Sequence, residues 1–365
     1  MKEIVLMKSD NAIKKCLHLA NKAEGKVSPN PLVGAVVFDK NGEYVSCGYH
    51  ERCGEAHAEV NALKKAGTKA QGGTIAVNLE PCSHWGKTPP CVDLIIKSGI
   101  KKVIVGMLDP NPKVNGNGVK KLKEHGIEVE VGILQNECER LNEIFIKNQK
   151  TKKPFIAIKT ATTLDGKIAT STNDSKWTTS EKSRKIVHQL RNRYDAILTS
   201  SATVIADNPQ MTCRLKNGRN PIRVILDKTL KTDFECEIYK NNTEKIFVVV
   251  DEKLKNLPQP PKNVEYLKSP LKDGKLDLQF VVNELFAKGI MSILIEAGGK
   301  LNGAFLKENL VDKIYHFQAP KILGDSKAKN WVEGFTTEKI SDSKKLEITK
   351  VKFINPDFLI EGNLS

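Results

Sequence analysis

Long apolar runs and aromatic residues are both scarce in this 365-residue chain. No stretch approaches the roughly 18 consecutive apolar residues that a membrane-spanning helix needs. Aromatic residues make up only 6% of the chain, which is few for a protein that stacks flipped or single-stranded bases. The start, Met1 to Lys8, is too charged for a secretory signal. We therefore expect a cytoplasmic protein that binds neither membranes nor nucleic acid.

Positive charge is present but is not concentrated anywhere. The formal net charge is +15, yet the lysines are scattered, without a basic arm, an arginine-rich block or a basic stripe interleaved with aromatics. Two interpretations remain open, a lysine-rich solvated surface or attraction of phosphorylated small substrates. The eight cysteines indicate thiols and metal ligands rather than disulfides, because no secretory signal precedes them.

The length favours two domains. Thr151 to Pro154 is a natural seam, so we predict domains at residues 1–150 and 151–365. No internal repeat is evident, and both parts alternate helical and strand patterns, which is typical of layered α/β domains. In the first part we expect helices at 9–20, 57–66 and 135–150 and strands at 32–38, 74–77 and 102–105. In the second part we expect strands at 155–159, 195–198, 222–226, 246–250 and 292–295 and helices at 180–193 and 301–307.

His57, Cys82 and Cys91 form the most informative pattern. One imidazole and two thiolates occupy three corners of a zinc tetrahedron and leave the fourth open for water. Glu59 is then placed to move protons without being a ligand, as in the zinc nucleobase deaminases. A closed structural site with His84 as the fourth ligand is the alternative, but it leaves Glu59 without a role. Iron in place of zinc also remains open, since these ligand types suit both metals.

The two cysteines are unusually far apart for this pattern. Deaminases usually carry them as Pro-Cys-x-x-Cys, whereas residues 83–90 separate Cys82 from Cys91. Cys91 opens an apolar helical run, where a helix start stabilises a thiolate. The inserted loop must double back beside the open zinc position, so His84 and Lys87 are candidate substrate contacts.

The second half has no metal-ligand pattern, which suits hydride delivery from an organic cofactor. A Gly-x-Gly-x-x-Gly fingerprint is missing there, which disfavours a Rossmann domain. The Gly298-Gly299 turn follows a strand and precedes a helix, so its N–H groups are candidates for holding a nucleotide phosphate. Arg191 and Arg214 are candidates for a substrate phosphate, because guanidinium binds phosphate bidentately. Exposed ion pairs are the alternative for both arginines.

Longer motifs resemble those of the bifunctional deaminase-reductases of riboflavin biosynthesis, over nearly the whole chain. The N-terminal motifs are SPNPLVGAVV at 28–37, HAE at 57–59, PCSHWGKTPPC at 81–91 and DPNP at 109–112. The C-terminal motifs are KTATTLDGKIA at 159–169, WT at 177–178, HQLR at 188–191, ADNP at 206–209, TCR at 212–214 and EAGG at 296–299. The long cysteine loop separates this family from general cytidine and tRNA-adenosine deaminases.

This resemblance implies two consecutive reactions. An N-terminal cytidine-deaminase-like three-layer domain would use zinc to remove the 2-amino group of 2,5-diamino-6-(5-phosphoribosylamino)pyrimidin-4-one. A C-terminal dihydrofolate-reductase-like domain would use NADPH to reduce the ribosyl chain to ribityl. The expected partners are phosphorylated pyrimidine substrates and further copies of the chain in a homo-oligomer. The alternative is a nucleic-acid or nucleoside deaminase with an accessory binding domain, and a zinc-stapled interaction module is a third reading.

The resemblance also assigns residues to the two sites. The implied deaminase substrate contacts are Asn30, His50, Lys87 and Asn111, beside His84. The implied NADPH contacts are Ala161, Trp177, Thr203, Asp207, Gly298 and Gly299. The implied reductase substrate contacts are Lys159, Ser175, Arg191, Met211, Arg214 and Glu296. Ser200-Ser201-Ala202 departs from the glycines that relatives carry in the cofactor loop, so weakened cofactor binding or a degraded reductase half is a further expectation to test.

Overall fold

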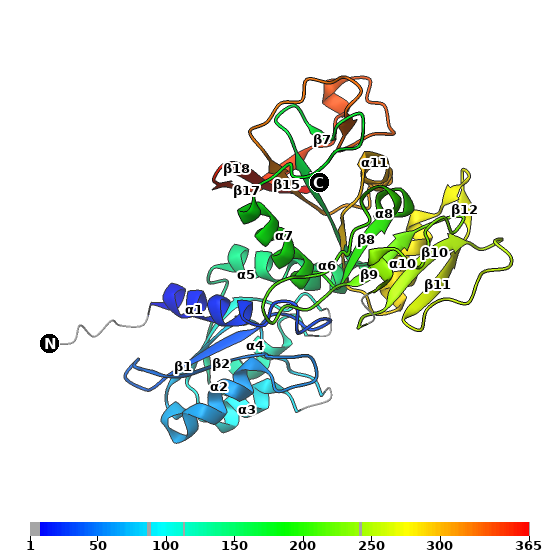
Figure 1. The fold of residues 1–365 in the computed structure, drawn as a ribbon. Helices are drawn as coiled ribbons and strands as arrows, with labels where there is room; N and C mark the ends of the chain where they lie inside the picture. Colours follow the sequence, from blue (N-terminus) through cyan, green and yellow to red (C-terminus); the bar gives the residue numbers. More distant parts are fainter. Residues whose placement is uncertain (1–7, 86–88, 112–113, 241–242, 365) are drawn as a thin grey trace. The chain divides into compact units, whose positions relative to one another are not determined.

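The computed structural model describes residues 8–85, 89–111, 114–240 and 243–364. The chain divides into two compact units, residues 1–152 and 153–365, and each is described by itself (Figure 1). Both units combine a main sheet with helices, so the predicted α/β class is confirmed. None of the helices in the described part of the chain is both long and apolar enough to cross a membrane.

The first unit is built on a five-stranded sheet. Its strands are β1 Gly34–Phe38, β2 Tyr44–Tyr49, β3 Thr74–Leu79, β4 Lys102–Met107 and β5 Glu128–Val131. The spatial order is β2-β1-β3-β4-β5. β1 runs antiparallel to both β2 and β3, whereas β3, β4 and β5 are parallel. β1 is buried along its whole length, which explains its uninterrupted apolar sequence.

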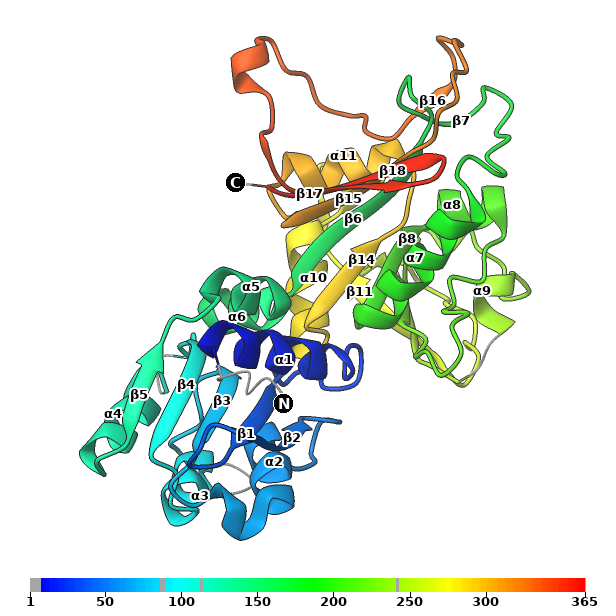
Figure 2. The same cartoon turned by 90° about the vertical axis from the view of Figure 1, so that its left-hand side faces the viewer.

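Helices cover both faces of this sheet and give the unit three layers, as predicted (Figure 2). They are α1 Ser9–Asn21, α2 Ala58–Ala66, α3 Cys91–Lys97, α4 Asn117–Glu124, α5 Gln135–Leu141 and α6 Glu143–Thr151, with a short 3₁₀ helix, η1, at Gly67–Ala70. α1 and α5 pack together on one face, and α2, α3 and α4 contact one another in turn on the other. α1 begins at Ser9, the first residue of the predicted range, and Lys8 is its N-cap.

The prediction of one helix over residues 135–150 is wrong. Two helices, α5 and α6, meet at Asn142, whose side chain is buried. Its Oδ1 accepts the N–H of Leu32 at 2.8 Å, and its Nδ2 donates to the Leu32 carbonyl at 3.1 Å. Asn78 at the end of β3 donates to the same carbonyl and accepts the N–H of Gly34. Two buried amides therefore hold the segment before β1 and interrupt the helix.

Two strands of the first sheet, β2 and β5, are absent from the sequence prediction. β2 is an edge strand with only alternate residues buried. β5 is an edge strand as well, and its Glu128 and Glu130 pair with Lys102 of β4 at 2.8 Å and 3.3 Å. Short and half-exposed strands carry a weak apolar signal, and charged edges protect a sheet from pairing with other chains.

The second unit contains a nine-stranded sheet. Its strands are β6 Phe155–Thr162, β8 Ala196–Ser200, β9 Ile222–Leu226, β10 Ile246–Asp251, β11 Val264–Ser269, β14 Ser292–Ile295, β15 Lys313–Gln318, β17 Leu346–Ile354 and β18 Asp357–Leu364. Their spatial order is β11-β10-β9-β8-β14-β6-β15-β18-β17. The strands from β11 to β15 are parallel, and β18 and β17 extend the sheet as an antiparallel hairpin. Ligand sites in such sheets lie at the carboxyl ends of the parallel strands.

Helices also cover both faces of the second sheet. They are α7 Glu181–Arg193, α8 Ser201–Asp207, α9 Glu237–Lys240, α10 Leu278–Ala287 and α11 Gly299–Lys307. Successive residues of β8 enter different cores: Leu198 packs in the cluster that contains α10 and α11, whereas Ile197 packs with Val204 of α8 and Ile238 of α9. The small elements are the pair β7 Lys167–Ala169 and β16 Lys329–Asn330, the pair β12 Leu271–Lys272 and β13 Lys275–Leu276, and η2 Ile340–Asp342.

Candidate functional site

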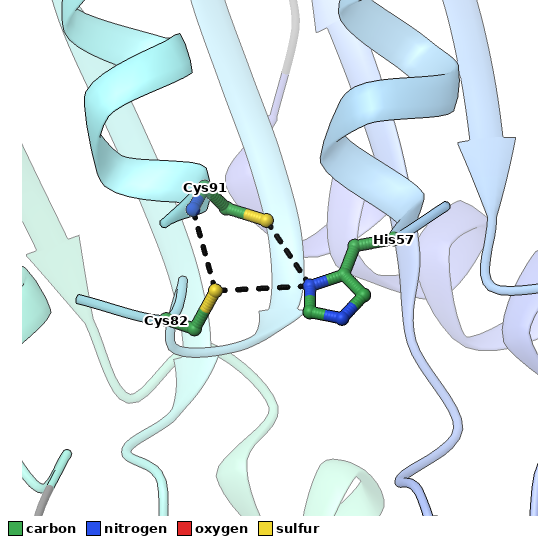
Figure 3. A group of neighbouring side chains, drawn as sticks. All are labelled: His57, Cys82 and Cys91. Atoms are coloured by element: carbon green, nitrogen blue, oxygen red, sulfur yellow. Dashed lines mark hydrogen bonds between the residues drawn. The ribbon is translucent and has the colours of Figure 1, made fainter. Parts of the chain in front are cut away.

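Three side chains of the first unit bring metal-ligand atoms together (Figure 3). Ligand atoms of His57, Cys82 and Cys91 all lie within 4.8 Å of one another. His57 Nδ1 lies 3.2 Å from Cys91 Sγ and 3.7 Å from Cys82 Sγ. A tetrahedral zinc ion with usual Zn–S and Zn–N lengths sets such nitrogen and sulfur ligands about 3.5 Å apart. The donor set therefore fits zinc, and among the described residues His84 is not a member of it.

Two helix starts and a strand end position these ligands. His57 is the N-cap of α2, Cys91 is the first residue of α3, and β3 leads toward Cys82. The N–H of Cys91 donates to Cys82 Sγ at 3.3 Å. Hydrogen bonding from Cys91, and then from His57, lowers the pKa of the Cys82 thiol to about 4. The lowered pKa favours the thiolate of Cys82, which is the form that binds metal.

Glu59 lies in the first turn of α2, and its side chain is buried. The carboxyl lines the same cavity as His57 and Cys82. Burial is the largest cause that raises the pKa of Glu59, and the negative charge of Cys82 adds to it. A buried carboxyl of this kind exchanges protons nearer neutral pH than an exposed glutamate does.

A cavity of about 250 Å³ opens beside these residues. Its wall includes four of the five predicted substrate contacts, namely Asn30, His50, His84 and Asn111. Asn30 Nδ2 lies 3.1 Å from His50 Nε2. His50 Nδ1 donates to the Ala56 carbonyl at 3.1 Å, and burial lowers the pKa of His50, so Nε2 is the nitrogen that accepts a proton from Asn30 Nδ2. The remaining implied contact, Lys87, lies outside the described residues.

Other residues of the cavity wall escaped the sequence prediction. They include Glu80, Asp109, Phe145 and Gln149. Asp109 opens the DPNP motif, and burial raises the pKa of its carboxyl to about 6. That motif was a signal for Asp109, whereas nothing in the polar sequence of α6 marks Phe145 or Gln149.

The second unit gathers a buried ion cluster where β14 ends and β6 passes beside it. Glu296 follows β14 directly, and its Oε1 accepts Arg191 Nε at 2.7 Å. Its Oε2 accepts Arg191 Nη2 at 2.9 Å and lies 2.8 Å from Lys159 Nζ. Burial opposes ionisation of Glu296, but the charges and hydrogen bonds of Arg191 and Lys159 outweigh it and lower the pKa of the carboxyl.

Arg191 is committed to partners within the chain. Besides Glu296, its Nη1 donates to the Thr212 carbonyl at 2.9 Å, and its Nη2 lies 3.9 Å from Met211 Sδ. The structure thus joins four implied reductase contacts, Lys159, Arg191, Met211 and Glu296. Arg214 is exposed, and its guanidinium contacts Gln210 at 3.4 Å.

The implied cofactor contacts are spread over several elements. Ala161 lies in β6 and Thr203 in the first turn of α8. Asp207, the last residue of α8, accepts the hydroxyl of Ser175 at 3.4 Å. Trp177 is exposed, with the Arg184 guanidinium 4.5 Å from its ring centre.

The N-termini of α8 and α11 account for the serine and the glycines found there. Ser200 is the N-cap of α8 and accepts the N–H of Thr203 at 3.3 Å, which is a physical reason for serine at this position. Gly298 is the N-cap of α11, with open space where a Cβ would stand. A Cβ on Gly299 would lie 2.4 Å from the Asn330 carbonyl oxygen, so packing requires glycine there.

Comparison with known proteins covers both units. Residues 7–107 match the cytidine and deoxycytidylate deaminase zinc-binding region, and residues 154–360 match the RibD C-terminal domain. The riboflavin biosynthesis protein RibD of Aquifex aeolicus is 42% identical over 96% of this chain and 97% of its own. The RibD protein of Escherichia coli is 39% identical over 96% of this chain and 98% of its own.

A solved structure also matches this chain over nearly its whole length. It is a diaminohydroxyphosphoribosylaminopyrimidine deaminase/5-amino-6-(5-phosphoribosylamino)uracil reductase from Thermotoga maritima. It is 41% identical, has a TM-score of 0.87, and the match covers 98% of this chain and 99% of that one.

A zinc-binding deaminase unit followed by a reductase unit defines a bifunctional enzyme, a hydrolase and an NADPH-dependent oxidoreductase in one chain. The cofactors are accordingly zinc and NADPH. The chain belongs to the RibD family of riboflavin biosynthesis proteins. This confirms the predicted cytidine-deaminase-like and dihydrofolate-reductase-like folds, and it disfavours a nucleic-acid or nucleoside deaminase with an accessory domain.

Proposed function

We propose that the first unit deaminates a diaminopyrimidine carrying a phosphoribosylamino group, and that the second unit reduces the product, as the description of the Thermotoga relative indicates for that protein. One observation carries the first half of this proposal. His57, Cys82 and Cys91 bring their ligand atoms within 4.8 Å of one another, and buried Glu59 lines the same cavity. A site that served folding alone would have no use for that carboxylate.

His57, Cys82 and Cys91 hold the zinc ion in this proposal. When bound, zinc lowers the pKa of a coordinated water from 15.7 to near 7. Glu59 takes a proton from the attacking water and delivers it to the ring nitrogen of the substrate. The same carboxyl then takes the second proton, from the new hydroxyl group, and passes it to the departing amine, so that water and the aminopyrimidine become the carbonyl compound and ammonia.

The cavity wall positions the substrate for this reaction. The hydrogen-bonded pair Asn30 and His50 is the proposed contact for the pyrimidine ring. His84, Lys87 and Asn111 are the proposed contacts for the ring substituents, the ribose or the phosphate. A cavity of about 250 Å³ is close to the volume of a small-molecule site.

In the second unit, Glu296 and Lys159 orient the ribosyl group that receives hydride from NADPH. Arg191 holds Glu296 through two hydrogen bonds, and Met211 and Ser175 are further proposed substrate contacts. Exposed Arg214 is the proposed phosphate ligand. We assign NADPH to Ala161, Trp177, Thr203 and Asp207, with the N-terminus of α11 at Gly298 and Gly299 facing a phosphate.

The experiment that tests both activities uses the full chain and the diaminopyrimidine ribosyl phosphate. Ammonia release should occur without NADPH, whereas NADPH oxidation should require the deaminated product. Ammonia release from cytidine or from RNA, with none from the pyrimidine phosphate, would contradict the proposal. NADPH oxidation that does not depend on prior deamination would contradict the order of the two steps.

We also propose that the chain forms a homo-oligomer through β17, the last strand of the second sheet. Ile348, Val351 and Phe353 are 58%, 62% and 60% exposed. A bulge keeps the three on one face of the sheet, opposite Gly362, Ile360 and Phe358 of β18. An antiparallel pair of two β17 strands centred between residues 349 and 350 would set each Glu347 opposite the partner's Lys352, so the charges are complementary.

Replacing Val351 and Phe353 by lysine together should break this assembly, because in that register charged side chains would lie opposite the partner's Ile348 and the partner's Leu346 in place of apolar contacts. Light scattering should report several chains for the unaltered protein and the 40.5 kDa of one chain for the variant. Val131→Lys on the exposed edge of β5 is the matched control. A monomeric unaltered protein, or an oligomer that survives both lysines, would rule this interface out.

All eight cysteines are free in the structure, which supports a proposed location in the reducing cytoplasm.

A further inference from the structure

The carboxylate of Glu80 is buried between the segment that carries the zinc ligand Cys82 and the segment from Asp109 to Val119. Glu80 lies between the end of β3 and Cys82. Its Oε2 accepts the N–H groups of Asp109 at 3.1 Å and Gly116 at 2.9 Å. Its Oε1 accepts those of Gly118 at 2.9 Å and Val119 at 3.2 Å.

These four bonds fill the capacity of one carboxylate. Gly116 is the N-cap of α4 and supplies no side chain to cap the helix. Glu80 takes over that capping role from a distant part of the sequence. Gly118 has no room for a Cβ, which would lie 2.3 Å from the Pro81 carbonyl oxygen and 3.1 Å from Glu80 Oε1. The helix start is therefore pressed directly against the segment that carries Cys82.

One of these hydrogen bonds connects Glu80 to the cavity wall, because Asp109 lies in that wall next to Asn111. Asp109 lines the cavity, and its Oδ1 accepts the N–H of Asn111 at 2.8 Å. Asn111 lines the cavity as well. A path of hydrogen bonds thus runs from the segment before Cys82, through Glu80 and Asp109, to Asn111.

From this arrangement we propose that Glu80 is a positioning residue of the deaminase reaction, fixing Asp109 and Asn111 at a set distance from the zinc ligands. This inference rests on the proposed deaminase function and extends it to a residue that neither binds the metal nor transfers a proton. In this proposal, Asp109 and Asn111 contact the substrate both when it first binds and in the transition state. Loss of these contacts should therefore raise KM more than it lowers kcat.

The substitution Glu80→Gln tests the role with minimal change in shape. An amide offers one oxygen and turns its NH₂ group toward backbone N–H groups, so at least two of the four donors lose their acceptor. We expect KM for the diaminopyrimidine phosphate to rise about tenfold or more, with kcat changed less than about threefold. One zinc per chain should remain, and reduction of the deaminated substrate by the same chain should be unchanged.

Two further variants keep the result decisive. Glu80→Asp retains the charge with a shorter reach and should give an intermediate KM; it also replaces Glu80→Gln if that protein fails to fold. Leu122→Ala loosens the same helix from its buried side and should leave KM within about twofold. An equal KM rise in Leu122→Ala would overturn the positioning role, because any loosening of α4 would then suffice.

Hydrogen exchange separates this inference from the proposed function. Amides of Asp109, Gly116, Gly118 and Val119 should be protected in the unaltered protein and exchange faster in Glu80→Gln. Faster exchange with an unchanged KM, or loss of zinc, would overturn the positioning role while leaving the deaminase proposal intact. An unaltered protein that protects these amides yet releases no ammonia would instead overturn the deaminase function, and the role of Glu80 with it.

Discussion

Glu59→Gln is expected to lower the rate of ammonia release by about 1,000-fold while zinc stays bound. The carboxyl is buried beside the zinc ligands, and general acid-base catalysis contributes factors of about 100 to 10,000. Glutamine keeps the size of the side chain but cannot accept and return a proton. Steady-state ammonia release, with zinc counted by mass spectrometry, measures the effect.

Two internal comparisons make this result specific. NADPH-dependent reduction of the deaminated substrate should be unchanged in Glu59→Gln, because that chemistry belongs to the other unit. Glu43→Gln, an exposed glutamate between β1 and β2, should behave like the unaltered protein. A Glu59→Gln protein that retains more than about a tenth of the deamination rate would show that another group moves the protons.

Glu296→Gln is expected to abolish most of the reduction and to destabilise the second unit. Arg191 and Lys159 would keep their charges in a buried place without the carboxylate that now lies 2.7 Å and 2.8 Å from them. Removing one partner of a buried ion pair costs about 3–5 kcal/mol in the free energy of unfolding. We expect NADPH oxidation to fall at least about 100-fold, since substrate orientation is lost, while deamination by the same chain is unaffected.

The pH dependence of stability provides a second readout for Glu296. Its pKa is lowered in the folded protein, so its contribution is present in full above the unfolded value near 4.3. The contribution is lost as the pH falls below that value toward the lower folded pKa. The stability difference between the unaltered protein and Glu296→Gln should be constant from about pH 7 to 5 and shrink below about pH 4.

Denaturant unfolding at several pH values measures that difference. Glu252→Gln, an exposed glutamate after β10, is the control and should show no such loss. A difference that grows as the pH falls would mean that the carboxyl is protonated in the folded protein, which contradicts the ion cluster.

Much of the architecture was predictable because the buried faces of helices and strands produce a periodic pattern of apolar residues in the sequence. The strands at 74–77 and 246–250 and the helix that begins at Cys91 are present within a few residues of their predicted ends. Two of the failures lie where that pattern is weak. β5 is a charged edge strand, and α5 and α6 form a polar sequence whose interruption depends on the bonds of Asn142 to Leu32.

The deaminase site was also easier to predict from the sequence than the reductase site. The identities of His57, Cys82 and Cys91 indicate their chemistry directly, since few other residue types bind zinc. The sequence left Arg191 between a substrate phosphate and an exposed ion pair, and the structure gives its guanidinium a carboxylate of the chain itself, Glu296. An arginine in a sequence shows that an anion is needed but does not show which one.

Residue identity and spacing alone were enough to predict the metal donors, the proposed proton carrier and the alternation of strands and helices. Those properties depend on the atoms that each side chain carries and on local periodicity. Only the tertiary structure decided which backbone groups the buried polar side chains hold. Glu80 bonds Gly116 across 36 positions and Asn142 bonds Leu32 across 110. Most buried polar groups in proteins have a hydrogen-bond partner, but the packing of the whole sheet and its helices selects that partner.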